Sequence, residues 1–227
     1  MTEPREIEAK FEIDDPTPLR ELKKAPPLTV VSAEEIIQVD TYLDTPDGAL
    51  HQAGSTLRLR ESSGRWTLTY KGKRAPSTIG HAHIASRVEV SEPVTAQVAA
   101  SILAGQRTET RLPPITLAGT ATGDAPLVPV ARIENHRTAI GLLDEAGRAY
   151  ELAVDDCRGE RLSDGRVLTF SEVELEARTA DHDDLLRAVD ALRTAVPSLR
   201  PSGQTKLARV LSQAAGGGTY NSHKRSY

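Results

Sequence analysis

The segment Arg5-Glu6-Ile7-Glu8-Ala9-Lys10-Phe11-Glu12-Ile13 alternates charged and apolar side chains over its whole length. Side chains two residues apart lie on the same face of a β-strand. The segment therefore carries a charged column and an apolar column: Glu6, Glu8, Lys10 and Glu12 against Ile7, Ala9, Phe11 and Ile13. This alternation predicts a strand with one polar face and one buried face.

Seven further segments alternate in the same way and are separated by turn sequences. We expect strands over residues 36–43, 56–61, 65–73, 84–91, 128–143, 148–156 and 167–177. Short connections such as Ser62-Ser63-Gly64 and Ser163-Asp164-Gly165 fit hairpins. Together they predict antiparallel β structure rather than βαβ units.

Helical spacing of apolar residues occurs in fewer places. We expect helices over residues 93–104 and 181–196, a shorter one that Ser202 caps and that ends at Leu211, and another over 16–24. Residues 108–126, rich in Thr, Pro, Gly and Ala, read as a long loop. We expect a single domain over residues 1–213 and a flexible C-terminal tail over 214–227, which begins with three glycines among its first five residues.

Composition excludes several classes of protein. The 227 residues are 38% hydrophobic and 26% charged, which suits a globular domain, but only 4% are aromatic. The net charge of −4 and the few aromatic residues argue against a nucleic-acid partner. A single cysteine, Cys157, cannot form an internal disulfide. With no signal peptide and no apolar run of membrane length visible, we expect a cytoplasmic protein without a membrane partner.

The charged columns have two interpretations. A sheet with one solvated face would show the same alternation. However, the signs are sorted: acids concentrate on the first and last predicted strands, and bases concentrate on the third and fourth, as in Arg58 and Arg60. A solubility face tends to mix the two signs. Sorted columns can bind a polyanion through Lys and Arg, and a hard cation such as Mg²⁺ through carboxylates.

Eight antiparallel strands can close into a barrel with room inside for side chains or a narrow ligand. We therefore predict an α+β protein, mainly antiparallel β, in which an eight-stranded closed, tunnel-like barrel has a charged interior and helices packed outside. A charged interior is costly unless each charge finds a partner, so it would be retained only for binding.

Several motifs resemble the CYTH superfamily of triphosphate tunnel metalloenzymes. Glu6-Ile7-Glu8-Ala9-Lys10 resembles the E-x-E-x-K signature of that family, and its other motifs follow in the family's order. They are Tyr42-Leu43-Asp44-Thr45, Leu57-Arg58-Leu59-Arg60, Tyr70-Lys71-Gly72, Arg87-Val88-Glu89, Arg132 with Arg137, Glu151-Leu152-Ala153-Val154-Asp155, Glu172-Val173-Glu174-Leu175-Glu176, and Lys206. The resemblance covers residues 5–211 and implies a tunnel that binds a triphosphate with Mg²⁺ or Mn²⁺.

On this resemblance each charged residue has an expected role. The metal ligands are Glu6, Glu8, Glu172 and Glu174. The residues expected to take part in catalysis are Glu6, Glu8, Lys10, Asp155 and Glu176. The residues expected to bind substrate are Lys10, Arg58, Arg60, Lys71, Lys73, Arg87, Glu89, Arg132, Arg137 and Lys206. Arg137 differs in parity from Arg132, so both can face the ligand only if a bulge intervenes.

The expected reaction is metal-dependent hydrolysis of a triphosphate, with inorganic tripolyphosphate as the first choice of substrate. Thiamine or nucleoside triphosphate hydrolysis and class IV adenylate cyclisation are alternatives, since the fold does not fix the reaction. No His-Phe pair of the cyclase type precedes the first motif, and no aromatic residue suited to stacking on a base is evident, which disfavours the cyclase and nucleotide alternatives. A non-catalytic polyphosphate or nucleotide sensor, and a barrel that serves only as an interaction protein, complete the alternatives. We expect a monomer or homodimer.

Overall fold

The computed structural model describes residues 5–22, 24–79, 82–106 and 112–212. The strands are β1 (Arg5–Glu12), β2 (Lys24–Ala25), β3 (Leu28–Asp44), β4 (Thr56–Ser62), β5 (Arg65–Lys71), β6 (Ala75–Ile79), β7 (Ala82–Val94), β8 (Val128–Leu143), β9 (Ala149–Arg161), β10 (Arg166–Ala177) and β11 (Arg200–Pro201). The helices are α1 (Thr17–Arg20), α2 (Ala49–Gln52), α3 (Ala96–Leu103), α4 (Pro113–Thr122), α5 (His182–Ala195) and α6 (Lys206–Leu211).

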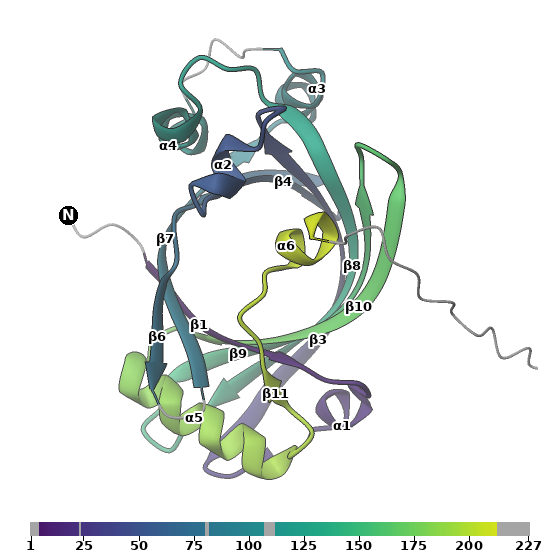
Figure 1. Cartoon of the computed structure of the whole chain (residues 1–227). Helices are drawn as coiled ribbons and strands as arrows, with labels where there is room; N and C mark the ends of the chain where they lie inside the picture. Colours follow the sequence, from purple (N-terminus) through teal and green to yellow (C-terminus); the bar gives the residue numbers. More distant parts are fainter. Residues whose placement is uncertain (1–4, 23, 80–81, 107–111, 213–227) are drawn as a thin grey trace, which may run out of the picture.

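Eight strands form a closed ring. Their order is β1, β10, β9, β8, β3, β4, β5 and β7, and the pairing of β7 with β1 completes the circle. The pairs between ring neighbours are antiparallel. Figure 1 looks along the axis of this ring, so the strands are seen around an open outline. The predicted eight-stranded tunnel is confirmed.

The outer face of the ring carries the main core. Phe11, Val173 and Leu175 point outward and pack against α5, which contributes Leu185 and Leu192 to the same cluster. On the opposite side, α2, α3 and α4 cover β4 and β5, where Leu57, Leu59 and Leu68 are fully buried. Apolar residues therefore face out toward helices, and charged residues are left to face the interior, as the alternation predicts.

Helix α6 is the exception among the helices, because it lies inside the outline of the ring (Figure 1). It packs against β8, β9 and β10. Leu207 and Val210 form a small apolar cluster with Tyr42, Ile133 and other inward-facing residues. Around this cluster the interior is apolar rather than charged. Gly159 makes the close approach possible, since a Cβ atom there would lie 2.3 Å from Cγ2 of Val210.

Several predicted boundaries change in the structure. β3 begins at Leu28, well before residue 36, because its first half pairs with the end of β8. α3 begins at Ala96 because Pro93 and Val94 still pair with β5, and Thr95 provides the cap. α6 begins after Thr205 rather than after Ser202, whose hydroxyl binds Glu12 instead.

The predicted loop over 108–126 is wrong in its second part, where α4 runs from Pro113 to Thr122. The helix is short of strong helix formers, but prolines occupy its first turn, where they need no hydrogen-bonded N–H. The predicted tail over 214–227 lies outside the described residues. Among the described helices, none is long and apolar enough to cross a bilayer.

Candidate active site in the tunnel

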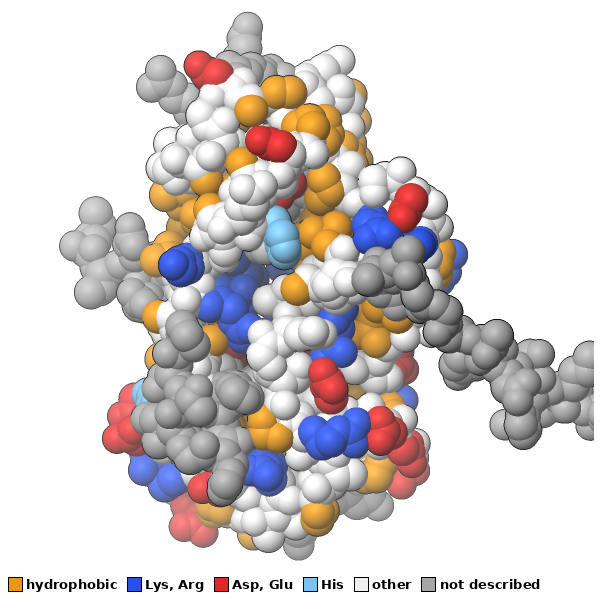
Figure 2. All heavy atoms as spheres, in the orientation of Figure 1, with side chains coloured by type: hydrophobic (Ala, Val, Ile, Leu, Met, Phe, Trp, Pro, Cys, Tyr) orange, Lys and Arg blue, Asp and Glu red, His pale blue; other side chains and the backbone are white. Residues whose placement is uncertain are grey.

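A cavity of about 530 Å³ lies inside the ring. Its lining is dominated by charged side chains from strands far apart in the sequence and from α6. Eight of them are cationic: Lys10, Arg58, Arg60, Lys71, Arg87, Arg137, Arg178 and Lys206. Four are acidic: Glu6, Glu89, Glu174 and Glu176. In the space-filling view, Lys and Arg side chains gather around a hollow near the middle of the face seen along the ring axis (Figure 2).

Strand register explains why these side chains converge. On β1 and β10, Glu8 is opposite Glu176 and Lys10 is opposite Glu174, so both charged columns share the inner face. Arg87 of β7 is opposite Glu6 of β1, where the ring closes. The alternation seen in each strand therefore becomes one continuous charged surface inside the tunnel.

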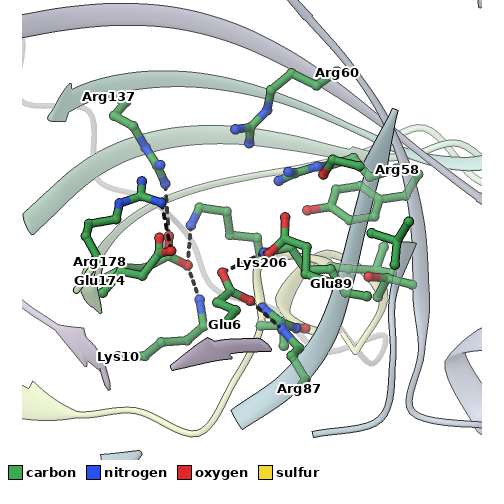
Figure 3. A pocket seen from close by; sticks show the side chains of 18 residues that line it. Glu6, Lys10, Arg58, Arg60, Arg87, Glu89, Arg137, Glu174, Arg178 and Lys206 are labelled. Carbon is green, nitrogen blue, oxygen red and sulfur yellow. Dashed lines mark hydrogen bonds and ion pairs between the residues drawn. The ribbon is translucent and has the colours of Figure 1, made fainter. Parts of the chain in front are cut away.

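Lys10 and Lys206 form the centre of the most buried ion cluster. Nζ of Lys206 lies 2.8 Å from Glu172, 2.9 Å from Asp155 and 3.0 Å from Glu174. Nζ of Lys10 lies 3.1 Å from Glu172 and also contacts Glu174 (Figure 3). Burial acts to lower the pKa of both lysines, but the surrounding carboxylates outweigh it and raise the pKa of each above its ordinary value. Both lysines are therefore charged.

Glu6 has a similar role at the seam of the ring. It accepts hydrogen bonds from Nζ of Lys71 at 2.7 Å and from Nε of Arg87 at 2.8 Å. Lys71 also lies 2.9 Å from Glu89. Burial acts to raise the pKa of Glu6, but Lys71 and Arg87 outweigh it and hold this pKa well below its ordinary value. Glu6 is therefore ionised, and it fixes two cations at the cavity wall.

Arg137 is held by two carboxylates. Its guanidinium donates to Asp155 at 2.7 and 2.8 Å and to Glu174 at 2.9 Å. Asp155 also accepts a hydrogen bond from Asn135, so both of its oxygens are occupied by protein donors. Such bidentate contacts fix the orientation of the guanidinium plane.

Arg58 and Arg60 are held by Asp40, a residue of β3 that is 0% exposed. Arg60 donates to both oxygens of Asp40, and Arg58 donates to one of them at 3.3 Å. Nε of Arg58 is buried and has no hydrogen-bond partner in the described part of the chain. Arg58 also lines the cavity, and the hydrogen bond to Asp40 uses only its Nη1, so the guanidinium has a further nitrogen for a ligand.

Glu176 differs from the other acids of the cavity. Burial raises its pKa to about 7, although the neighbouring Arg178 acts to lower it. Arg178 donates to Glu176 at 2.8 Å and to Glu151 at 2.7 Å, and 46% of its side chain is exposed, so it lies at the solvent end of the cavity. A carboxyl group with a pKa near 7 is suited to exchange protons at neutral pH.

The predicted metal ligands do not form a ready metal site. Among the described residues, no three acidic, His or Cys side chains converge as ligands would. Glu6, Glu8, Glu172 and Glu174 each contact Lys or Arg within 3.1 Å. A divalent ion needs several oxygen ligands at about 2.1 Å, and in this arrangement ammonium and guanidinium groups hold those oxygens.

The structure sorts the predicted site residues into three groups. Those that line the cavity are Glu6, Lys10, Arg58, Arg60, Lys71, Arg87, Glu89, Arg137, Glu174, Glu176 and Lys206. Three others do not line it and are almost fully buried behind the wall, where they hold its cations: Glu8, Asp155 and Glu172.

Two predicted substrate-binding residues lie away from the cavity. Arg132 is on the outer face of β8, where it pairs with Glu134 and its side chain is 41% exposed. Arg137 is on the inner face without any bulge between the two, so the difference in parity separates them. Lys73 follows the end of β5, is exposed, and lies beside Gly54 outside the cavity.

Sequence reasoning gave no site role to several charged or aromatic residues of the site region. Arg178 and Tyr42 line the cavity, Asp40 holds two of its arginines, and Arg74 lies 3.4 Å from Glu8. The alternation along β3 could have identified Asp40 and Tyr42 as residues of the tunnel, because Gln38, Asp40 and Tyr42 lie on the same face of that strand. Arg178 lies just beyond the end of β10, where alternation gives no information.

A sequence model of the CYTH domain matches residues 4–211. None of the curated proteins compared with the chain matches it significantly.

Three solved structures with this fold are distant from this chain in sequence. A proposed adenylyl cyclase from Hippeastrum, described as having a dominant triphosphatase activity, has a TM-score of 0.67 at 18% identity, with 90% of this chain and 94% of that chain covered. A proposed adenylate cyclase from Bacillus halodurans has a TM-score of 0.65 at 17% identity, with 93% and 100% covered. A protein from Pyrococcus horikoshii OT3 has a TM-score of 0.52 at 17% identity, with 91% and 98% covered. At these identities the likeness establishes the fold.

Proposed function

Because this chain belongs to the CYTH domain family, we propose that it hydrolyses a phosphoanhydride bond of a triphosphate held in the tunnel cavity. The observation that carries the proposal is the cavity lining, in which eight Lys and Arg side chains face four acids. A linear triphosphate offers many oxygen acceptors at short intervals, which such a row of charged donors can bind.

The carboxylates behind the wall support this use. Glu8, Asp155 and Glu172 hold lysine and arginine side chains in place before any ligand arrives. Donors that are already oriented lose little freedom when they bind a phosphate, and they need not reorganise as charge moves onto the leaving group. The buried acids are therefore positioning residues, and the cavity cations are the groups that would contact substrate.

We assign Glu176 as the general base that takes a proton from the attacking water. Its pKa of about 7 suits proton transfer near neutral pH, and it lies in the cavity wall beside Arg178. The other cavity acids with a resolved shift, Glu6 and Glu174, have a lowered pKa and are tied to cations. They are weaker bases than Glu176.

Inorganic tripolyphosphate is the substrate we propose. Tyr42 is the one aromatic residue among those found to line the cavity in the described chain, so a pair of rings to hold a nucleobase or thiamine is missing from that lining. Dependence on Mg²⁺ or Mn²⁺ belongs to the same proposal on the strength of the family. In the described part of the chain the carboxylates of the tunnel are ion-paired and do not form a ready metal site.

The test is phosphate release from tripolyphosphate, pyrophosphate, ATP and thiamine triphosphate, each with Mg²⁺, with Mn²⁺ and with a chelator. We expect turnover of tripolyphosphate that falls at least about 100-fold in Glu176→Gln, the loss typical of a missing general base. Arg58→Ala should raise KM, and Arg132→Ala is the matched control, because Arg132 faces outward.

Each failure has a defined meaning. Tight tripolyphosphate binding without turnover would make the protein a sensor rather than a hydrolase. If Arg58→Ala binds and hydrolyses tripolyphosphate as the wild type does, the cavity is not the substrate site. Full activity with chelator present would remove metal dependence from the proposal.

A further inference from the structure

Tyr42 places the single aromatic ring of the cavity lining beside its cations. On β3 it is opposite Arg58 of β4 and Ala131 of β8. Its side chain is 6% exposed and belongs to the apolar cluster formed with Leu207 and Val210 of α6. It also lines the cavity, so the residue is packed on one side and faces the cavity on the other.

The hydroxyl group of Tyr42 has no hydrogen-bond partner among the residues that the structure describes, and its oxygen is not among the fully buried atoms of that kind, so it keeps access to the cavity that Tyr42 lines. Two other buried tyrosines do have one: the Tyr70 hydroxyl lies 3.2 Å from Oγ of Ser55, and that of Tyr150 donates to Asp144 at 3.0 Å. Buried tyrosine hydroxyls usually find a hydrogen-bond partner. The partner of Tyr42 is therefore to be sought in the cavity.

The charge around Tyr42 determines what this hydroxyl can offer. Burial raises the pKa of the phenol, and the carboxylate of Asp40 raises it further, while Arg58 and Lys206 act in the opposite direction. The net effect is a raised pKa, so the group keeps its proton at neutral pH. It is a neutral donor between two cationic donors, and none of these three side chains carries a negative charge.

We propose that the Tyr42 hydroxyl donates a hydrogen bond to a phosphate oxygen of the bound triphosphate at the α6 end of the cavity. This inference rests on the proposed function. Leu207 and Thr205 form the wall there, and Arg58 and Lys206 flank the position. Tyr42 is thus a substrate-contacting residue that adds a directed contact without adding charge.

The experiment compares Tyr42→Phe with Tyr70→Phe. Each variant removes one buried hydroxyl and keeps the ring. Tripolyphosphate binding is measured by calorimetry with chelator present. The values of kcat and KM are measured under the condition that gives the fastest turnover, and Tm is measured with and without tripolyphosphate. For Tyr42→Phe we expect an unchanged Tm without ligand, since no protein hydrogen bond is lost, and about tenfold weaker binding, as for a lost hydrogen bond to a charged group.

Tyr70→Phe should show the opposite pattern. Its hydroxyl bonds Ser55 on the outer side of β4 and β5, so we expect a lower Tm and unchanged tripolyphosphate binding. A purely structural role of Tyr42 would not produce this pattern, in which one variant loses tripolyphosphate binding and the other loses thermal stability.

Three results would overturn the inference. If the wild type binds and hydrolyses tripolyphosphate and Tyr42→Phe matches it in Kd and kcat/KM, the inference fails while the proposed function stands. If Tyr42→Phe lowers the ligand-free Tm as Tyr70→Phe does, the hydroxyl has a structural partner. If the wild type neither binds nor hydrolyses tripolyphosphate, the proposed function fails, and the inference fails with it.

Discussion

Asp40 and Arg60 form a bidentate ion pair inside the ring, with Nε and Nη2 of Arg60 at 2.6 and 2.7 Å from the two oxygens of Asp40. Asp40 is 0% exposed, and it also contacts Arg58. Burial acts to raise the pKa of Asp40, but the two arginines outweigh it and lower this pKa below its ordinary value. The aspartate is therefore ionised, and it offsets one of the two positive charges of the guanidinium groups that face the cavity.

Asp40→Asn should lower the free energy of unfolding by about 3 kcal/mol, because a buried ion pair that loses one partner leaves an uncompensated charge. Urea unfolding at pH 7 measures this loss. The matched control is Asp14→Asn: Asp14 also forms a bidentate pair, with Arg200, but 86% of its side chain is exposed. No measurable change is expected there. Equal losses of stability in the two variants would contradict the role given to the buried ion pair.

Added tripolyphosphate should restore part of the stability lost in Asp40→Asn, since it supplies negative charge to Arg58 and Arg60.

The inner and outer faces of β8 show how far alternation predicts this site. Parity correctly separates the residues of β8 into two columns, but on this strand the column that holds Arg132 and Glu134 is not the one that faces the tunnel. On β8 the inner column includes Ala131, Ile133 and Asn135 before it reaches Arg137, because α6 fills this end with apolar side chains. The more polar column, with Arg132, is therefore the outer one, and the rule that charge faces inward fails at that end.

The position of α6 could not be read from the sequence for a related reason. It has six residues, too few for a clear apolar face, and it follows a two-residue strand that pairs with β1. Its place is fixed by contacts between distant segments, such as Lys206 with Asp155 and Leu207 with Tyr42. In contrast, β1 and β10 alternate so regularly that both their existence and their inner columns are predictable, and the structure confirms them.

Glu176→Gln should change the dependence of stability on pH. The folded-state pKa of Glu176 is about 7 and its ordinary value is 4.5, so between these values the folded chain holds a proton that the unfolded chain has lost. Stability of the wild type should therefore fall as pH rises through this window. The glutamine stays neutral and escapes this loss.

The expected difference can be measured by urea unfolding of both proteins at pH 5 and pH 8. At pH 8 Glu176→Gln should be more stable by about 1–2 kcal/mol, less than the full shift implies, because 25% of the side chain is exposed. At pH 5 the two proteins should differ much less. A constant difference at both pH values would mean that Glu176 is not the titrating group.

Gly159→Ala should separate α6 from the strand beneath it. The added Cβ would lie 2.3 Å from Cγ2 of Val210, a β-branched side chain with little rotamer freedom on a helix, so the helix has to shift. Overpacking of this kind costs about 1–3 kcal/mol. Because Lys206 begins the same helix and contacts three carboxylates in and behind the cavity wall, tripolyphosphate binding should weaken as well. Gly119→Ala in α4 is the control: its Cβ would meet no atom within 4 Å, and alanine is the better helix former, so a gain of up to about 1 kcal/mol is expected.

A double-mutant cycle with Val210→Ala decides whether this contact is the cause. Val210→Ala alone removes buried methyl groups and should cost about 1–2 kcal/mol. In that background the clashing methyl group is absent, so Gly159→Ala should cost nothing, or should stabilise the strand slightly by restricting the unfolded chain. The two substitutions should thus be strongly non-additive, with a coupling free energy of about 1–3 kcal/mol. Additive losses would show that α6 is not packed on Gly159. Recovery of tripolyphosphate binding in the double variant would tie the position of Lys206 to the docking of α6 inside the ring.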